Sequence, residues 1–290
     1  MIATRLRYPS VRAVVLNSAG APEQAEIAEP DGPDVLRVLA CGLCGSDDEK
    51  IGRAAEGTVL GHEVVAEADG KRVALVHHQP CGECERCLGG HESTCVEFGA
   101  PTIQPGGFAE RVVALGGWVD LPDDVDDAIG SYAEPLACVL RGTDRVPPGE
   151  VLVLGGGFVG RLFEAVLARR GDTVYVRDTD PARSGPEPPG PVATAVVCAP
   201  RAGSDALEAV KPGGSILVFA EAGELDTGEI YRREITVTGS RSATRAHMEE
   251  AVALLPELDV PEPLVLPLER FDEGLAAYRN REALKVVFRP

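Results

Sequence analysis

The chain has 290 residues, of which 44% are hydrophobic and 26% charged, and its formal net charge is −18 at pH 7. So acidic a chain repels phosphate backbones and anionic lipid, and we therefore expect neither a nucleic-acid partner nor a membrane surface. No run of about eighteen apolar residues could cross a bilayer, and residues 1–12 lack the apolar stretch of a signal peptide. We therefore expect a cytoplasmic protein. Its length predicts two domains, since single cores stop growing near this size.

The first part of the chain is predicted to be rich in β-structure. Short apolar runs typical of strands lie at residues 11–16, 35–39, 60–68 and 72–76. Residues 81–102 are polar and rich in glycine and cysteine without any periodicity, so this segment cannot form a core and needs a staple. A connecting helix is expected over residues 135–145, before the break at Pro147-Pro148-Gly149.

Strands and helices alternate from residue 151 onward. An apolar strand at residues 151–154 runs into three glycines, and a helix follows that ends at Gly171. Further strands are expected at residues 173–176, 193–199, 215–220 and 235–239, with a short helix capped by Ser204 and another helix over 246–255. This alternation predicts an α/β domain with a doubly wound parallel sheet. The proline-rich segment 184–191 stands where such a domain usually has a helix, so the domain is expected to be trimmed.

The sharpest motif is Cys81-x2-Cys84-x2-Cys87-x7-Cys95. Four thiolates on a short polar loop suit a tetrahedral Zn²⁺ with every position filled, which is the pattern of a structural metal site. An iron–sulfur cluster and redox-active thiols are the less favoured alternatives. Disulfides are not expected in a chain of this length without an export signal.

A second group of possible metal ligands is dispersed along the chain. Cys44 follows a predicted strand, the pair His62-Glu63 lies in the next strand segment, and Glu134 precedes the connecting helix. A thiolate, an imidazole and a carboxylate with one open position suit a catalytic zinc. Each residue is weak by itself, because a lone Cys or His is more often packed or solvated.

A glycine loop, Gly155-x-Gly157-x-x-Gly160, lies between a predicted strand and a helix. In this context the glycines permit a tight turn, the close approach of a pyrophosphate to the backbone, and close packing of helix on strand. Asp178 follows the next strand, where a carboxylate accepts hydrogen bonds from a ribose and favours NAD over NADP. Arg177 and Arg183 lie nearby in the sequence and weaken that preference, and another nucleotide stays an alternative ligand.

Taken together, these motifs resemble the medium-chain, zinc-dependent alcohol dehydrogenase family, in particular its polyol, threonine and glucose dehydrogenase branches. Besides the cysteine motif and the glycine loop, the resemblance rests on Cys41-Gly42-Leu43-Cys44-Gly45-Ser46-Asp47, Gly61-His62-Glu63, Gly106-Gly107-Phe108-Ala109-Glu110, Glu134-Pro135-Leu136-Ala137, Lys211-Pro212-Gly213-Gly214, Val237-Thr238-Gly239-Ser240 and Lys285-Val286-Val287. It implies a GroES-like, zinc-binding catalytic domain at residues 1–145 and 257–290, and a Rossmann dinucleotide-binding domain at 146–256.

The resemblance also implies a role for individual residues. Cys44 and His62 match catalytic zinc ligands, and Glu63 and Glu134 match two carboxylates of which either can be the third ligand. Asp47 matches the carboxylate that orients the zinc histidine, and Ser46 the hydroxyl that takes the substrate proton. The implied cofactor-binding residues are Gly155, Gly157, Phe158, Val159, Gly160, Asp178, Arg183 and Lys285.

The implied activity is transfer of a hydride between a nicotinamide cofactor (NAD, with NADP possible) and a small alcohol, polyol or matching carbonyl compound, with two zinc ions per chain. A homodimer or homotetramer is implied through an edge of the nucleotide-domain sheet, with the strands around residues 196–198 and 235–237. The alternative is a catalytically impaired dinucleotide-binding relative with a structural zinc only. One departure concerns proton release: Glu49 stands where many relatives have a histidine.

Overall fold

The computed structural model describes residues 9–290. Most of the segment 1–12, for which the sequence predicts no signal peptide, therefore lies outside the described residues. The chain divides into two compact units, each with a hydrophobic core of its own. Unit 1 comprises Met1–Glu134, Met248–Pro256 and Glu262–Pro290, and unit 2 comprises Pro135–His247 and Glu257–Pro261. Within residues 9–290, no helix is long and apolar enough to cross a membrane.

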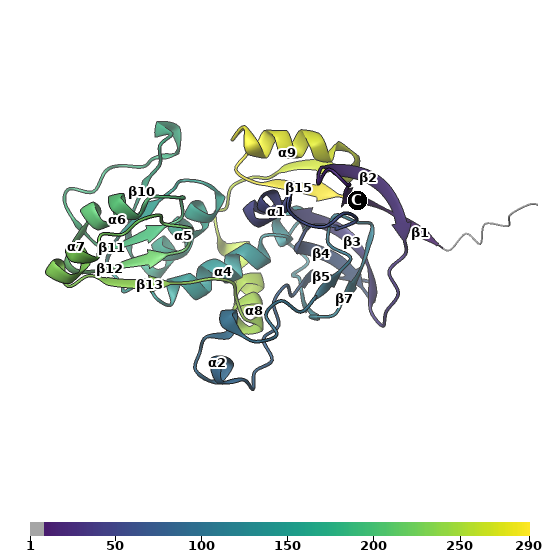
Figure 1. Cartoon of the computed structure of the whole chain (residues 1–290), viewed down its shortest axis with the longest axis horizontal. Coiled ribbons are helices and arrows are strands. Elements are labelled where there is room, and N and C mark those ends of the chain that lie inside the picture. Colours follow the sequence, from purple (N-terminus) through teal and green to yellow (C-terminus); the bar gives the residue numbers. More distant parts are fainter. Residues whose placement is uncertain (1–8) are drawn as a thin grey trace, which may run out of the picture. The chain divides into compact units, whose positions relative to one another are not determined.

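Unit 1 is built mainly from β-strands (Figure 1). β1 (Ser10–Leu16) and β2 (Pro22–Ala28) form an antiparallel hairpin. A larger sheet has the order β14-β15-β3-β4-β5-β8, with β7 also paired to β3 and β6 to β7. Its strands are β3 (Val35–Gly42), β4 (Glu63–Ala68), β5 (Lys71–Leu75), β6 (Ile103–Gln104), β7 (Arg111–Ala114), β8 (Trp118–Asp120), β14 (Leu264–Pro267) and β15 (Val286–Arg289).

The core of unit 1 centres on three phenylalanines from distant parts of the chain. Phe108 meets both Phe271 and Phe288 edge to face, at centroid distances of 5.0 and 5.6 Å. Phe271 begins α9 (Phe271–Arg279), and Phe288 lies in β15, so these contacts tie the C-terminal part of the chain into the unit. Aromatic pairs with this geometry add stability beyond the apolar area that they bury.

The pairing of β3 with β4 places the ends of two loops side by side. The strands are antiparallel, and Gly42 at the end of β3 pairs with Glu63 at the start of β4. The short helix α1 (Gly45–Lys50) begins just after β3. The strand expected from residue 60 begins only at Glu63, because the preceding backbone turns to bond with another loop, where the Phe108 N–H donates to the Leu60 carbonyl.

Unit 2 holds a five-stranded parallel sheet with the order β10-β9-β11-β12-β13. Alternate residues of β9 face opposite sides: Leu152 and Leu154 share a core with α6, whereas Val153 faces Gly160 of α5. The sheet is therefore covered on both faces, as the alternation of elements predicts. Its strands are β9 (Glu150–Leu154), β10 (Thr173–Arg177), β11 (Val192–Val197), β12 (Val210–Val218) and β13 (Thr236–Gly239).

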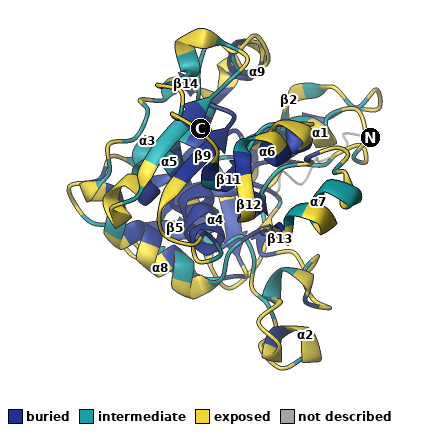
Figure 2. Ribbon diagram, turned by 90° about the vertical axis from the view of Figure 1, so that its left-hand side faces the viewer, coloured by how far each residue is buried: buried dark blue, intermediate teal, exposed yellow. Residues whose placement is uncertain are grey.

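The helices of the chain differ in length and exposure (Figure 2). Besides α1 and α9, they are α2 (Glu85–Leu88), α3 (Asp127–Gly130), α4 (Ala133–Thr143), α5 (Phe158–Arg170), α6 (Gly203–Ala209), α7 (Thr227–Arg233) and α8 (Arg245–Leu254). α7 was not expected from the sequence. Its start is nevertheless signalled by Asp226, whose side chain accepts hydrogen bonds from the first-turn N–H groups of Gly228 and Glu229.

Several sequence predictions about unit 2 can be compared with the structure. The trimming is confirmed: β10 and β11 are connected by a loop whose only described helical turn is the 3₁₀ segment Pro181–Arg183. The predicted cap was wrong, since Ala202 rather than Ser204 precedes α6. The strand around residues 196–198 cannot offer a sheet edge, because β11 is paired on both sides, whereas β13 does lie at an edge.

Candidate active site

Three side chains with metal-binding atoms converge in unit 1. One ligand atom each from Cys44, His62 and Glu63 lies within 4.8 Å of the other two. Cys44 precedes α1 as its N-cap, and His62 and Glu63 lie at the start of β4, so the pairing of β3 with β4 creates the group. His62 is 6% exposed and Glu63 1% exposed, and these buried donors face one another instead of solvent.

Asp47 holds this group in place from within α1. It is fully buried, and its carboxylate accepts hydrogen bonds from the backbone N–H groups of Cys44 and Gly61 at 3.1 and 3.2 Å. The same carboxylate lies 3.2 Å from Nδ1 of His62. When Nδ1 donates to Asp47, Nε2 is the nitrogen left to bind a metal, which is how carboxylates orient zinc-binding histidines.

The protonation of this pair follows from burial and charge. Burial alone raises the pKa of Asp47, but the charge and hydrogen bond of His62 and the two backbone N–H groups outweigh it, so the pKa is lowered. Burial alone lowers the pKa of His62, but the charges of Asp47 and Cys44 and their hydrogen bonds raise it well above its usual value. Asp47 is therefore an anion that faces the imidazole.

Glu63 is paired with a lysine that the resemblance had assigned to the cofactor. Lys285 is 2% exposed, and its ammonium forms an ion pair with the Glu63 carboxylate and donates to the Leu43 carbonyl at 3.1 Å. Both contacts of its Nζ therefore lie inside unit 1, and one of them is with Glu63, which is itself a member of the converging group. No local pattern in the sequence could have shown this pair, whose members are 222 positions apart.

The structure places the other candidate residues at different depths. The Ser46 hydroxyl donates to Cys44 Sγ at 3.4 Å, so it lies directly beside the group. Glu49 is exposed on α1. Glu134 is 9% exposed in the first turn of α4, but its carboxylate is not among the converging atoms found in residues 9–290.

The donor set of Cys44, His62 and Glu63 fits a zinc ion with an open coordination position. Zinc binds thiolate sulfur, imidazole nitrogen and carboxylate oxygen alike, and its catalytic sites have three protein ligands. Harder cations such as Mg²⁺ or Ca²⁺ require oxygen ligands and would be poorly served by a thiolate. The arrangement can therefore hold a Lewis acid that remains accessible to a small molecule.

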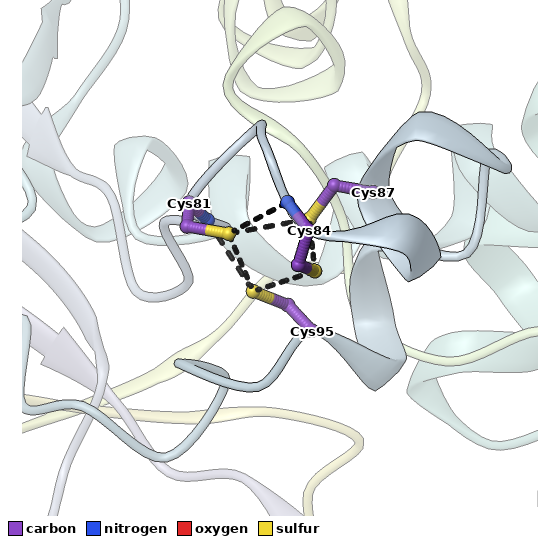
Figure 3. Close-up of side chains that lie close together, drawn as sticks. All are labelled: Cys81, Cys84, Cys87 and Cys95. Carbon is purple, nitrogen blue, oxygen red and sulfur yellow. Dashed lines mark hydrogen bonds between the residues drawn. The ribbon is translucent and has the colours of Figure 1, made fainter.

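The four clustered cysteines form a second centre, on a lobe that includes α2 and that is mainly exposed (Figures 1 and 2). Their side chains point toward one another (Figure 3), with sulfur–sulfur distances of 3.5, 3.5, 3.9 and 3.9 Å. Four sulfurs around one zinc at about 2.3 Å would lie about 3.8 Å apart. All eight cysteines of the chain are free thiols, so no disulfide competes for these sulfurs.

Local hydrogen bonds favour the metal-binding form of part of this lobe. Backbone hydrogen bonds lower the pKa of Cys84 to about 6. The pKa of Cys95 is also lowered, chiefly by the hydrogen bond that the Cys81 backbone N–H donates to its sulfur. Burial raises the pKa of Cys87 to about 12. A thiol with a lowered pKa binds a metal as thiolate near neutral pH, and a bound cation would deprotonate the remaining sulfurs.

A row of aromatic rings joins the two metal-binding groups, and the sequence did not predict it. His77 packs against His62 with ring centroids 4.4 Å apart, and His78 packs against His77 at 3.9 Å. Phe98 stacks on His78 at 4.2 Å with an interplanar angle of 13°. Burial, followed by the neighbouring histidines, lowers the pKa of His77 far below its usual value. The only signal in the sequence was the His-His pair just before Cys81.

The glycine loop of unit 2 has the geometry that close approach requires. Gly155 follows β9 with φ of 108°, and a Cβ at Gly160 would lie 1.8 Å from the Gly155 carbonyl oxygen. A Cβ at Gly157 would meet nothing within 4 Å, and no side chain caps the start of α5 there. The first N–H groups of this 13-residue helix are therefore suited to an anion such as a pyrophosphate.

Asp178 lies beside this loop, as the spacing predicts. One of its oxygens accepts the Gly156 N–H at 2.7 Å and the other accepts the Asp180 N–H at 2.9 Å. Arg177 is turned to Glu187, with contacts of 2.5 to 3.2 Å. The Arg183 carbonyl packs against Gly156, where a Cβ would come within 2.3 Å of it.

Comparison with known proteins agrees with this geometry. Residues 31–123 match the alcohol dehydrogenase GroES-like domain family. L-galactonate-5-dehydrogenase of Escherichia coli is 26% identical over 91% of this chain and 94% of its own, and D-altritol 5-dehydrogenase of Agrobacterium fabrum is 29% identical over 78% and 81%.

Solved structures share the fold. Acetophenone reductase from Geotrichum candidum, in complex with NAD, superposes with a TM-score of 0.85 over 98% of both chains at 17% identity. A thermostable alcohol dehydrogenase from Pyrobaculum aerophilum superposes with a TM-score of 0.84 over 97% of this chain and 100% of its own, at 21% identity. Residues 31–123 thus form an alcohol dehydrogenase GroES-like domain, and over most of its length the chain is similar to polyol dehydrogenases.

Proposed function

We propose that the protein is a zinc-dependent oxidoreductase that transfers a hydride between a nicotinamide dinucleotide and an alcohol or polyol, or the matching carbonyl compound. The observation that carries this proposal is the convergence of Cys44, His62 and Glu63 beside the buried carboxylate of Asp47. The uncapped glycine loop of the other unit supplies the second requirement, a place for a pyrophosphate.

The substrate class follows from the relatives. Those with the broadest coverage are named for dehydrogenation of L-galactonate, D-altritol and sorbitol, which are all polyhydroxylated compounds. A secondary hydroxyl flanked by further hydroxyls is the feature that these substrates share. We therefore place a small-molecule polyol or sugar acid, instead of a simple apolar alcohol, first among the substrates of this chain.

Cys44 and His62 hold the zinc, and Glu63 completes the set. When bound, zinc supplies a Lewis acid that stabilises the negative charge of a deprotonating alcohol. Asp47 keeps the imidazole of His62 in the metal-binding orientation, and Lys285 balances the charge of the buried Glu63. Glu134 is the competing third ligand: loss of metal in Glu134→Gln but not in Glu63→Gln would assign the role to Glu134.

The proton of the substrate leaves through α1. The Ser46 hydroxyl donates to Cys44 Sγ, and its lone pairs stay available to accept the proton of a bound alcohol. Glu49 lies three residues further along the same helix, on the same side, and it is exposed. As Ser46 accepts that proton its hydroxyl releases its own, and we assign to Glu49 the uptake of the released proton and its transfer to solvent, in place of the histidine that many relatives have at that position.

NAD is the favoured cofactor, and it supplies the hydride acceptor when bound. Gly155, Gly157 and Gly160 give the pyrophosphate its access to the start of α5, with Phe158 and Val159 in the first turn. The Asp178 carboxylate repels a 2′-phosphate and accepts ribose hydroxyls. We also assign Arg183 to cofactor binding, because its backbone carbonyl packs against Gly156 of the glycine loop.

Assembly and domain division are part of the same proposal. We assign residues 1–145 and 257–290 to the catalytic domain and 146–256 to the dinucleotide-binding domain. A homodimer or homotetramer forms through β13, whose outer edge lies at the end of the sheet and carries the 37%-exposed Val237. A monomer in analytical ultracentrifugation at micromolar concentration would contradict the oligomer. A cytoplasmic location stays a prediction from the sequence.

The experiment that tests the function measures metal content and turnover together. Purified protein should contain two zinc ions per chain and reduce NAD with at least one member of a panel of polyols and sugar acids, with NADP assayed in parallel. Cys44→Ser and His62→Ala should retain one zinc and lose turnover, whereas His91→Ala, a change at an exposed lobe histidine, should retain both. Equal turnover in parent, Cys44→Ser and His62→Ala would refute the proposal. Cofactor binding without turnover across the panel would favour the impaired relative.

A further inference from the structure

The ring of His62 is held on two sides. Its Nδ1 faces Asp47, and this hydrogen bond sets the direction of the nitrogen but leaves the ring free to tilt about that contact. The ring of His77 packs at 4.4 Å with an interplanar angle of 31° and thereby removes this freedom. The His77 carbonyl is itself bound by the hydroxyl of the buried Thr102, so His77 is anchored from the far side.

The support of His77 continues into the four-cysteine lobe. His78 contacts His77 on one side and stacks on Phe98 on the other. His77 and His78 lie in the segment that connects β5 to Cys81, the first lobe cysteine. Phe98 lies in the segment that leaves the lobe, three residues after Cys95, and its N–H donates to the Cys95 carbonyl at 3.1 Å. The stack therefore clamps together the two ends of the lobe.

The sulfur cage closes the same two ends. The Cys81 N–H donates to Cys95 Sγ at 3.3 Å, and the two sulfurs are 3.5 Å apart. A zinc ion shared by Cys81 and Cys95 would tie the incoming and outgoing strands of chain covalently at one point. Without it, the thiol contacts, the ring stack and the hydrogen bond between Thr102 and His77 would remain to keep the two ends together.

We propose that His77 is a positioning residue for the metal ligand His62, and that the stack His77–His78–Phe98 couples the four-cysteine lobe to the catalytic metal centre. The lobe then has a role outside its own segment, because it positions the rings of His78 and His77, and His77 in turn positions His62. This inference rests on the proposed zinc at Cys44 and His62. It predicts that removing the ring of Phe98, which stacks on His78, weakens metal binding at Cys44 and His62.

The test measures metal affinity and geometry instead of activity. Protein with zinc in the lobe is depleted of the other metal and titrated with Co²⁺ against a competing chelator, and the visible spectrum is recorded. Three substitutions probe the stack: His77→Ala removes the ring beside His62, His77→Phe retains a ring, and Phe98→Ala removes the far end. His91→Ala is the matched control, because His91 is a lobe histidine outside the stack.

We expect His77→Ala and Phe98→Ala to bind Co²⁺ roughly tenfold more weakly than the parent, at the lower end of the range for residues that orient metal ligands, with His77→Phe and His91→Ala within about twofold. The cobalt bands should shift in His77→Ala and return toward the parent in His77→Phe. Zinc content confirms in each variant that the lobe is loaded.

The outcomes separate the two proposals. Parent protein that takes up no cobalt at a site with a single thiolate overturns the proposed function and this inference together. A normal parent with unchanged affinity in His77→Ala overturns the role of His77. A weakened His77→Ala with an unchanged Phe98→Ala overturns the coupling to the lobe. Should His77→Ala fail to fold, a tenfold loss in the folded His77→Phe would equally overturn the role given to ring packing.

Discussion

Replacing Lys285 by methionine is expected to destabilise unit 1 strongly. The side chains of Lys285 and Glu63 are 3% and 1% exposed, so solvent screens their ion pair very little. Methionine keeps much of the length of lysine but leaves the Glu63 carboxylate buried without a counter-charge and the Leu43 carbonyl without its ammonium donor. The loss therefore arises from an orphaned charge and not from a cavity.

The magnitude follows from the burial of the pair. Removing one partner of a buried ion pair costs about 3–5 kcal/mol, because the remaining charge stays desolvated. For a unit of this size, 1 kcal/mol corresponds to a change in Tm of about 2–4 °C, so we expect a decrease of about 6–20 °C. The double variant Glu63→Gln with Lys285→Met should recover most of this loss, since both charges are then absent.

The assay is thermal unfolding followed by circular dichroism at neutral pH, with protein that keeps zinc in the four-cysteine lobe but is depleted of the metal at Cys44 and His62, because a cation there would balance the charge of Glu63. Lys71→Met is the matched control, because Lys71 forms an ion pair with Asp120 at 3.0 Å but its side chain is 70% exposed, and no measurable change in Tm is expected. If Lys285→Met unfolds at the same temperature as Lys71→Met, or if the double variant is less stable than Lys285→Met, the reasoning about the buried pair is wrong.

Three further predictions concern the orienting carboxylate, the glycine loop and a buried aspartate. Asp47→Asn should weaken zinc binding at Cys44 and His62 by about 10–100-fold in chelator competition, since a neutral amide orients His62 poorly; unchanged affinity would contradict this role. Gly160→Ala should weaken NAD binding at least about tenfold in titration calorimetry, because its Cβ would lie 1.8 Å from the Gly155 oxygen, whereas Gly190→Ala, with nothing within 4 Å, should bind normally. Asp172→Asn should cost about 1.5–3 kcal/mol at pH 7, because the 2%-exposed carboxylate accepts from Arg170 and Gly149 at 2.7 Å. Burial alone raises the pKa of Asp172, but these hydrogen bonds and the Arg170 charge lower it. Its contribution is therefore complete above the unfolded pKa of about 3.9 and is lost as the pH falls through the folded pKa, so parent and Asp172→Asn should converge in Tm below about pH 4. A constant gap across that range would contradict this assignment.

The parts of the protein that sequence predicted well are those whose determinants are local. The four lobe cysteines span fifteen residues, so their spacing alone indicated a shared ion, and their sulfurs lie at the distances of such a cage. The glycine loop is likewise a contiguous signal between β9 and α5. The alternation of apolar strands and helices predicted the parallel sheet. The proline-rich segment predicted the absence of a helix between β10 and β11, because proline restricts the backbone at its own position.

The start of α6 and the presence of α7 were not predicted for a related reason. Ser204 has the side chain of a cap, yet Ala202 takes that position, and the first N–H group of the helix, that of Gly203, donates to the Ala222 carbonyl of another segment at 2.8 Å. The helix α7 is seven residues long and has no buried residues, so it has no periodic apolar face that a sequence could display.

The amino-acid sequence by itself indicated the family resemblance, the four-cysteine motif, the glycine loop and the order of strands and helices, since each is written in short spacings. Only the tertiary structure decided which side chains share a site. Antiparallel pairing of β3 with β4 joins Cys44 to His62 and Glu63, while β15 brings Lys285 to Glu63 across 222 positions. The stack of His77 on His62 arises in the same way. Strand register and packing set these contacts, and they depend on the whole core, whereas a sequence motif extends only along the chain.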